Sequence, residues 1–189
     1  MKYFNVTVCA SGGGGNFQAL IDVREKFGFE INCLIVDREC GAIKRAEEVG
    51  IAVKRISGSN RMLGDELDNA IPADTNLVVL AGFMPIVPSC ICEKWNRKMI
   101  NTHPSLLPKF GGKGMYGVKV QEAVIAAGEK FAGCTVHFVS QEIDGGEVIL
   151  QRTLEINHGE TPWQLGGRIF IEENKLLVDA VRLLLSRAL

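Results

Sequence analysis

The chain has 189 residues, of which 47% are hydrophobic and 23% are charged, a composition typical of a folded globular domain. Its 21 basic and 22 acidic side chains give a formal net charge of −1, so it lacks the basic surplus of nucleic-acid-binding proteins. With no apolar run long enough for a membrane span and no secretory signal pattern, we expect a single cytoplasmic domain over residues 1–189, with no nucleic-acid or membrane partner.

The first half of the chain alternates segments typical of strands with segments typical of helices. We expect strands at residues 3–10, 30–36, 52–56 and 77–81, and helices at 16–27, 42–49 and 62–71. Asn16 is the expected N-cap of the first helix, and Gly28 is its stop signal. This alternation, with short connections, predicts an α/β fold with a Rossmann-like, mostly parallel sheet flanked by helices.

The second half departs from the alternation. We expect a strand ending near residue 101, a loop at 103–117, a helix at 118–127, strands at 134–139 and 147–154, and a final helix at about 161–188. A loop of this length inside a compact domain is usually functional.

Cysteine and histidine spacing does not predict a metal site. Cys90 and Cys92 are close in sequence but have no histidine nearby, and His103, His137 and His158 lack the spacing of metal ligands. We therefore expect no metal and reduced thiols that act mostly as small buried hydrophobic groups.

Four glycines at residues 12–15 follow the first strand and open the first helix, where α/β proteins often bind phosphate through free backbone N–H groups. The dinucleotide fingerprint fails because Phe17 stands where its third glycine is required, and no P-loop Lys follows. Asp37 ends the second strand, where a ribose-binding acid would lie. The pattern leaves open both an anion site and a tight turn without a ligand.

Asn101 and His103 are two residues apart at the expected end of a strand, so their side chains should point the same way. Pro104 keeps His103 in an extended conformation. An amide beside an imidazole suits the stabilisation of an oxyanion. A purely structural histidine before proline is the alternative.

Asp144 precedes two glycines, a pattern typical of a hairpin turn. A functional interpretation requires Asp144 to lie near His103 and relay protons, which nothing in the local sequence decides. We interpret His137 as a packed strand residue and His158 as an exposed loop residue.

Together these segments resemble the phosphoribosylglycinamide formyltransferases, the folate-dependent formyltransferases of purine synthesis. The matching stretches are SGGGGNFQAL at 11–20, LAGFM at 80–84, INTHPSLLP at 100–108, GCTVHF at 133–138 and IDGGEVILQ at 143–151. They cover nearly the whole chain in the order of the family. The resemblance implies the formyltransferase fold, with antiparallel C-terminal strands.

The resemblance also implies residue roles. Asn101, His103 and Asp144 would form the catalytic set. Substrate contacts are implied for Gly14, Gly15 and Asn16, which would hold the ribonucleotide phosphate, and for Glu173. Contacts with the co-substrate 10-formyltetrahydrofolate are implied for Arg61, Met84, Pro85, Ile86, Val87, Asn101, Val139, Ser140, Gln141 and Asp144. The resemblance further implies a cis bond before Pro108, small-molecule substrates and a monomer or weak homodimer.

The implied reaction is direct attack of the glycinamide amine on the formyl carbon. Asn101 and protonated His103 would stabilise the oxyanion, and Asp144 would assist proton transfer through a water molecule.

Three features depart from the family pattern. Gly15 stands where Ser or Thr is usual, so a hydroxyl contact with phosphate is missing. Pro85 stands where a basic residue is common. Residues 111–117 form a glycine-rich variant of the mobile loop of the family, in which Lys113 is a candidate source of positive charge.

Related folate enzymes formylate methionyl-tRNA or sugar amines, or hydrolyse the formyl-folate, and normally carry an additional domain. The chain length and near-neutral charge disfavour these three activities, and the glycine run with Asn16 favours a small phosphorylated acceptor. A non-catalytic nucleotide-binding module that uses the glycine run and Asp37 is an alternative of another class, but it leaves Asn101, His103 and Asp144 unexplained.

Overall fold

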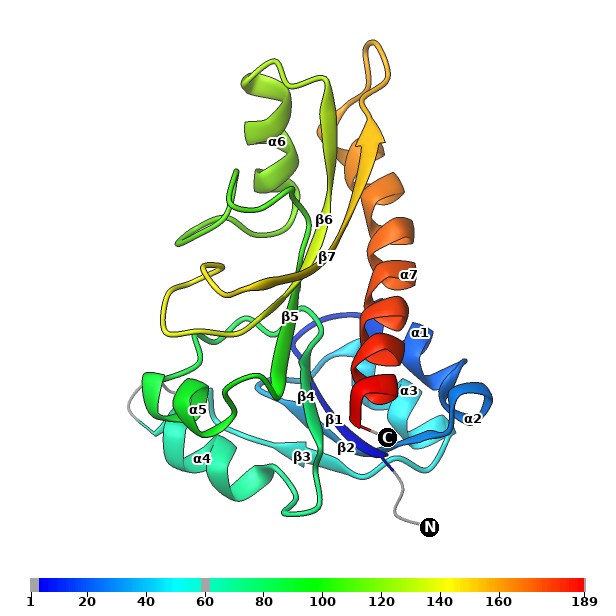
Figure 1. The fold of residues 1–189 in the computed structure, drawn as a ribbon, viewed down its shortest axis with the longest axis vertical. Helices are drawn as coiled ribbons and strands as arrows, with labels where there is room; N and C mark the ends of the chain where they lie inside the picture. Colours follow the sequence, from blue (N-terminus) through cyan, green and yellow to red (C-terminus); the bar gives the residue numbers. More distant parts are fainter. Residues whose placement is uncertain (1–3, 59–61, 189) are drawn as a thin grey trace.

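The computed structural model describes residues 4–58 and 62–188 (Figure 1). The seven strands are β1 (Phe4–Ala10), β2 (Phe29–Val36), β3 (Val53–Arg55), β4 (Leu77–Leu80), β5 (Met99–His103), β6 (Phe131–Phe138) and β7 (Val148–Glu155). The helices are α1 (Gly15–Ile21), α2 (Arg24–Phe27), α3 (Gly41–Glu48), α4 (Leu63–Ala70), α5 (Ser89–Lys94), α6 (Val118–Ala126) and α7 (Pro162–Ala188).

All seven strands form one sheet in the order β3-β2-β1-β4-β5-β6-β7. The pairs from β3 to β5 are parallel, whereas β6 runs antiparallel to both β5 and β7. Parallel pairs require crossover connections, which the helices of the first half supply. This confirms the predicted fold class, a Rossmann-like sheet with antiparallel C-terminal strands.

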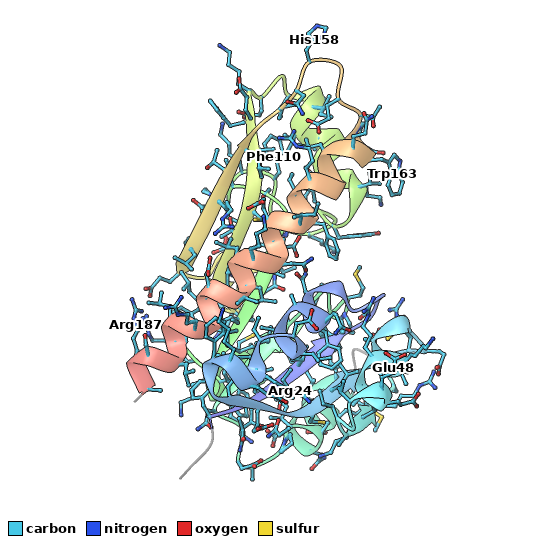
Figure 2. All side chains as sticks on the ribbon, turned by 90° about the vertical axis from the view of Figure 1, so that its right-hand side faces the viewer. Arg24, Glu48, Phe110, His158, Trp163 and Arg187 are labelled. Carbon is cyan, nitrogen blue, oxygen red and sulfur yellow. The ribbon has the colours of Figure 1, made fainter. Side chains whose placement is uncertain are left out.

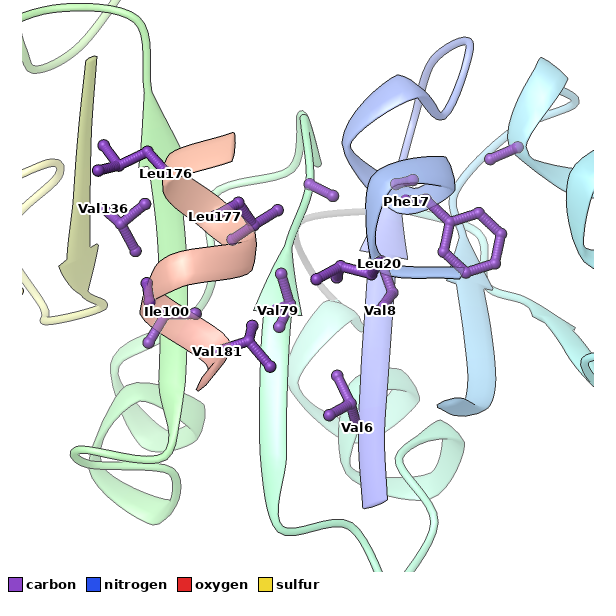
Figure 3. Close-up of a cluster of buried hydrophobic side chains, with 14 of the residues drawn as sticks. Val6, Val8, Phe17, Leu20, Val79, Ile100, Val136, Leu176, Leu177 and Val181 are labelled. Carbon is purple, nitrogen blue, oxygen red and sulfur yellow. The ribbon is translucent and has the colours of Figure 1, made fainter. Parts of the chain in front are cut away.

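The two faces of the sheet bury separate hydrophobic clusters because side chains alternate along each strand. On β1, Val6 and Val8 belong to one cluster, whereas Cys9 belongs to the other. Helices α4 and α5 cover the Cys9 side. Figure 3 shows the opposite cluster, in which α1 and α7 pack on the sheet through Phe17, Leu20, Leu176, Leu177 and Val181 against Val6, Val8, Val79, Ile100 and Val136.

Helix α7 is 27 residues long and crosses the molecule from Trp163 near its start to Arg187 near its end (Figure 2). A capping box begins it: the Thr161 N–H donates to Gln164 Oε1 at 2.9 Å, and the Gln164 N–H donates to Thr161 Oγ1 at 3.3 Å. Its apolar side packs on both β6 and α1. The helix therefore connects the parallel and antiparallel parts of the sheet.

Two predicted details of the helices are wrong. The expected helix at residues 16–27 is two helices, α1 and α2, and the N-cap of α1 is Gly14 with a φ of 74°, not Asn16. The side chain of Asn16 instead donates to Glu173. Helix α5 was not predicted, because Pro85 and Pro88 make its surroundings look like a loop.

All six cysteines are free, as expected for reduced thiols. Cys9, Cys33, Cys92 and Cys134 are buried, but Cys90 is exposed, because the short helix α5 presents it to solvent. Burial raises the pKa of the Cys134 thiol to about 12, so it is protonated at neutral pH. None of the helices within residues 4–58 and 62–188 is long and apolar enough to span a membrane.

Candidate active site

A pocket of about 530 Å³ opens at the carboxyl ends of β1, β4 and β5, within the usual size range of small-molecule sites. The loop after β5 and the loop between β6 and β7 project to the same side of the molecule and form part of its wall (Figure 1). The predicted site residues that line it are Gly14, Gly15, Asn16, Met84, Pro85, Ile86, Val87, Asn101, His103, Val139, Ser140, Gln141, Asp144 and Glu173. The predicted Arg61 lies outside the described residues.

His103 lies at the end of β5 and is only 5% exposed. Its Nε2 is 2.9 Å from the carbonyl oxygen of Phe110. Because a backbone carbonyl can only accept, Nε2 carries a hydrogen. The other ring nitrogen, Nδ1, faces Asp144 Oδ2 at 3.5 Å. The ring therefore lies between the Phe110 carbonyl group and the Asp144 carboxyl group.

The carboxyl group of Asp144 lies between two imidazole rings. Its Oδ2 accepts a hydrogen bond from the Gly112 N–H at 2.8 Å, and its Oδ1 is 3.7 Å from His137 Nε2. Burial raises the pKa of Asp144, but the contacts with His137, His103 and Gly112 outweigh it, and the net pKa is below the usual aspartate value. The side chain is therefore a carboxylate at neutral pH.

The chain turns sharply where it carries Asp144, which has a φ of 56°. A Cβ atom on Gly146 would lie 1.8 Å from the carbonyl oxygen of Phe138, the last residue of β6. Only glycine therefore lets the loop pass this close to the end of β6. The turn therefore places Asp144 close to His103, which is the proximity that the functional interpretation requires.

His137 of β6 pairs with Asn101 of β5 across the antiparallel strands. Its Nδ1 is 2.9 Å from the carbonyl oxygen of Phe138 and so carries a hydrogen. Its Nε2 lies 3.2 Å from Asn101 Nδ2, within hydrogen-bonding distance of the amide. The prediction that His137 packs within a strand is confirmed, but the sequence analysis missed that it also lines the pocket.

Gly15 lies against the aromatic ring of Phe170 from α7. A Cβ atom on Gly15 would be 2.2 Å from Phe170 Cζ. The departure at Gly15 therefore does more than remove a hydroxyl, because it makes room for a ring that lines the pocket. Phe170 was not predicted as a site residue, although it lies one helical turn before Glu173.

We expect Gly15→Ser to destabilise the protein by about 1–3 kcal/mol, because the new side chain must displace the Phe170 ring. In a Phe170→Ala background the same substitution should lower the free energy of unfolding much less. Urea unfolding of the two single variants and the double variant measures this coupling, with the exposed Ile171→Ala as the control for the background change. Equal costs in both backgrounds would show that the ring does not constrain residue 15.

Glu173 is 8% exposed and connects α7 to α1, since its Oε1 accepts from Asn16 Nδ2 at 2.8 Å. Burial raises the pKa of this carboxyl, and the hydrogen bond from Asn16 opposes the rise only in part. Ionising Glu173 is therefore harder in the folded protein than in the unfolded chain.

This raised pKa predicts a pH-dependent effect of Glu173→Gln. The wild type should lose stability relative to the variant as pH rises from about 4, the ordinary glutamate range, through the raised pKa of Glu173. Urea unfolding from about pH 3.5 to pH 7.5 measures the difference. Neighbouring Glu172 is the control, because Lys175 and Arg152 lower its pKa and Glu172→Gln should shift stability the opposite way. A difference independent of pH would contradict the prediction.

The segment after β4 forms an apolar wall, in which Met84 and Ile86 expose their side chains. Ser11 holds this segment, since its Oγ accepts from the Met84 N–H at 2.8 Å. Asp37, the suggested ribose ligand, accepts a hydrogen bond from Arg38 Nε at 2.9 Å and does not line the pocket. The nucleotide-binding alternative therefore loses its acidic residue.

The family model described as formyl transferase matches residues 4–181. A curated relative from Vigna unguiculata, named as a chloroplastic phosphoribosylglycinamide formyltransferase, is 35% identical over 187 residues, covering 95% of this chain and 60% of the relative. The trifunctional purine biosynthetic protein adenosine-3 of Bos taurus is 36% identical over 195 residues, covering 99% of this chain and 19% of the relative. The chain thus spans less than two thirds of either relative.

Two solved structures with a similar fold carry the same name as the plant relative. A phosphoribosylglycinamide formyltransferase from Anaplasma phagocytophilum has a TM-score of 0.86 and 33% identity, covering 97% of this chain and 87% of its own. The corresponding structure from Bacillus halodurans has a TM-score of 0.89 and 28% identity, covering 98% and 97%. Because the family model matches nearly the whole chain, the chain belongs to the formyl transferase family.

Proposed function

We propose that the protein transfers the formyl group of 10-formyltetrahydrofolate to the amine of phosphoribosylglycinamide. The observation that carries the proposal is the convergence of Asn101, His103 and Asp144 in one pocket, between a glycine loop and an apolar wall. The names of the relatives and structural neighbours, which include phosphoribosylglycinamide formyltransferases from plants and bacteria, support this acceptor.

The glycine loop suits the phosphate of the acceptor. The backbone N–H groups of Gly12, Gly13 and Gly14 donate no hydrogen bond within the described part of the chain, so they are available to an anion. Glu173 faces the same pocket and offers an acceptor to a hydroxyl or ammonium group of the substrate. We assign Gly14, Gly15, Asn16 and Glu173 to this substrate.

The opposite wall suits a flat heteroaromatic ring such as that of a folate. Met84, Pro85, Ile86 and Val87 offer apolar surface and backbone groups, as does the segment with Val139, Ser140 and Gln141. Arg61 is a proposed further contact. The described residues contain no group of three or more side chains that could hold a metal ion, and the proposed reaction requires none.

In the proposed mechanism the acceptor amine attacks the formyl carbon, and the carbonyl electron pair moves to oxygen. Asn101 Nδ2–H donates a hydrogen bond to this oxyanion, and protonated His103 stabilises it by its positive charge. Asp144 stabilises the imidazolium by its negative charge, at 3.5 Å from Nδ1. A water molecule near Asp144 carries the amine proton to the departing folate nitrogen, so collapse of the intermediate yields tetrahydrofolate and the formylated acceptor.

The test is the reaction itself. The protein is mixed with phosphoribosylglycinamide and 10-formyltetrahydrofolate, and the folate product is followed by absorbance and the formylated nucleotide by mass. Turnover that requires the nucleotide supports the proposal. Loss of the formyl group without the nucleotide would indicate a hydrolase and overturn it, as would the absence of any reaction.

A further inference from the structure

Arg45 of α3 lies behind the glycine loop, on the side away from the pocket. Its Nε donates to the carbonyl oxygen of Gly13 at 2.8 Å, and its Nη1 donates to Gln18 Oε1 at 2.9 Å. One guanidinium group therefore bonds both the loop and α1. Arg45 does not line the pocket, so it would not contact a ligand there directly.

The loop rests directly on α3. Gly14 has a φ of 74°, and a Cβ atom on it would lie 2.9 Å from Ala42 and 3.2 Å from Arg45 Cδ. The carbonyl oxygen of Gly12 accepts from the Ala42 N–H at 3.2 Å. The carbonyl groups of Gly12 and Gly13 thus both point towards α3.

This orientation decides where the N–H groups of the loop point. In a trans peptide the C=O and the following N–H point in opposite directions. Fixing the Gly13 carbonyl on α3 therefore directs the Gly14 N–H away from α3, and fixing the Gly12 carbonyl does the same for the Gly13 N–H. Glycine peptides rotate easily, so the orientation needs such anchors. A rotated peptide would present a carbonyl dipole to an anion and repel it.

We propose that Arg45 is a positioning residue for the phosphate subsite, holding the Gly13–Gly14 peptide with its N–H towards the ligand. The inference deepens the proposed function, since the ligand is the phosphate of the formyl acceptor. Arg45 also places a positive charge behind the loop, which favours an anion in front of it.

Ribose 5-phosphate is the probe, because its binding can be measured by calorimetry without formyl transfer. We expect Arg45→Met to weaken its binding about tenfold, the size of effect expected for losing a hydrogen bond from a charged group. Arg45→Lys keeps the charge but loses the planar guanidinium group that bonds both Gly13 and Gln18. Its affinity for ribose 5-phosphate should therefore lie between that of Arg45→Met and that of the wild type. Lys44→Met is the matched control, because Lys44 is exposed, adjacent and of equal charge.

Two readouts separate positioning from a general loss of structure. In Arg45→Met the KM for the phosphorylated acceptor should rise about tenfold, with kcat and the folate KM within about twofold of the wild type. The amide resonance of Gly14 should shift on adding ribose 5-phosphate to the wild type, and much less in the variant. Urea unfolding of each variant shows whether it is folded under these conditions.

The outcomes distinguish this inference from the proposed function. Unchanged ribose 5-phosphate affinity in a folded Arg45→Met overturns the positioning role, whatever the enzyme assay shows. Equal weakening by Lys44→Met overturns it too, because the effect would then be only net charge. A wild type that binds ribose 5-phosphate but transfers no formyl group contradicts the proposed function and leaves the role of Arg45 in phosphate binding intact.

Discussion

Replacing His103 by alanine is expected to lower kcat for formyl transfer by at least about 100-fold, the order of loss on removing one group that stabilises an oxyanion. Two contacts hold the His103 ring in one orientation, and alanine can make neither of them. The Phe110 carbonyl fixes the hydrogen on Nε2 and leaves Nδ1 facing Asp144, so the side chain holds a proton at a defined atom of the pocket. Single-turnover measurement of formylated nucleotide gives the effect on chemistry.

The matched control for His103→Ala is His158→Ala. His158 lies exposed in the segment between β7 and α7 (Figure 2) and does not line the pocket. The His158→Ala substitution should leave kcat unchanged. Ribose 5-phosphate should bind His103→Ala with nearly wild-type affinity, because the glycine loop does not contact His103 by any hydrogen bond. A kcat within tenfold of the wild type would remove His103 from the mechanism.

Asp144→Asn is expected to produce the second large effect, a fall in kcat of about 100-fold. Asparagine keeps the shape of the side chain and tolerates the φ of 56°, so the main change is the loss of negative charge between His103 and His137. The imidazolium of His103 then loses its counter-charge. Steady-state kinetics at neutral pH measures the fall, with Glu122→Gln on the exposed face of α6 as a control that also removes one charge.

The lowered pKa of Asp144 also predicts how the stability difference between the wild type and Asp144→Asn depends on pH. A carboxyl with a folded pKa below its unfolded value contributes stability above the unfolded value, and this contribution disappears as pH falls through the folded pKa. The wild type should therefore be more stable than Asp144→Asn above about pH 4, and the difference should shrink in more acidic solution. A difference that grows on acidification would contradict the assigned charge state.

Much of the fold could be predicted because its signals are local. The apolar run of β4 and the glycines that follow helices can be identified in the sequence without knowing any neighbour. The errors arise where tertiary contacts override local preference. Asn16 has the chemistry of an N-cap, but the buried Glu173 provides a stronger partner 157 residues away. Helix α5 has too few residues for a detectable helical period.

The site residues also fall into two groups, those that local sequence predicts and those that depend on tertiary contacts. The pairing of Asn101 and His103 on one side of β5 follows from strand geometry alone. The proximity of Asp144 to His103 depends on the path of the chain between β6 and β7, and the contact of His137 with Asn101 depends on the register of β5 and β6. Phe170 depends on how α7 docks over Gly15. The resemblance predicted Asp144, and nothing in the local sequence predicted His137 or Phe170.

The continuity of the sheet limits how ligands reach the pocket. Every neighbouring pair from β3 to β7 is hydrogen-bonded, and α7 packs across the boundary between the parallel and antiparallel strands. Two rigid halves cannot swing apart without breaking backbone pairing and core packing at once. Entry and exit of the proposed ligands would therefore depend on the loops that line the pocket outside the sheet, which include those after β5 and β6. The loop after β5 carries Phe110 and Gly112, which bond His103 and Asp144, so any movement of this loop would also disturb the two proposed catalytic side chains.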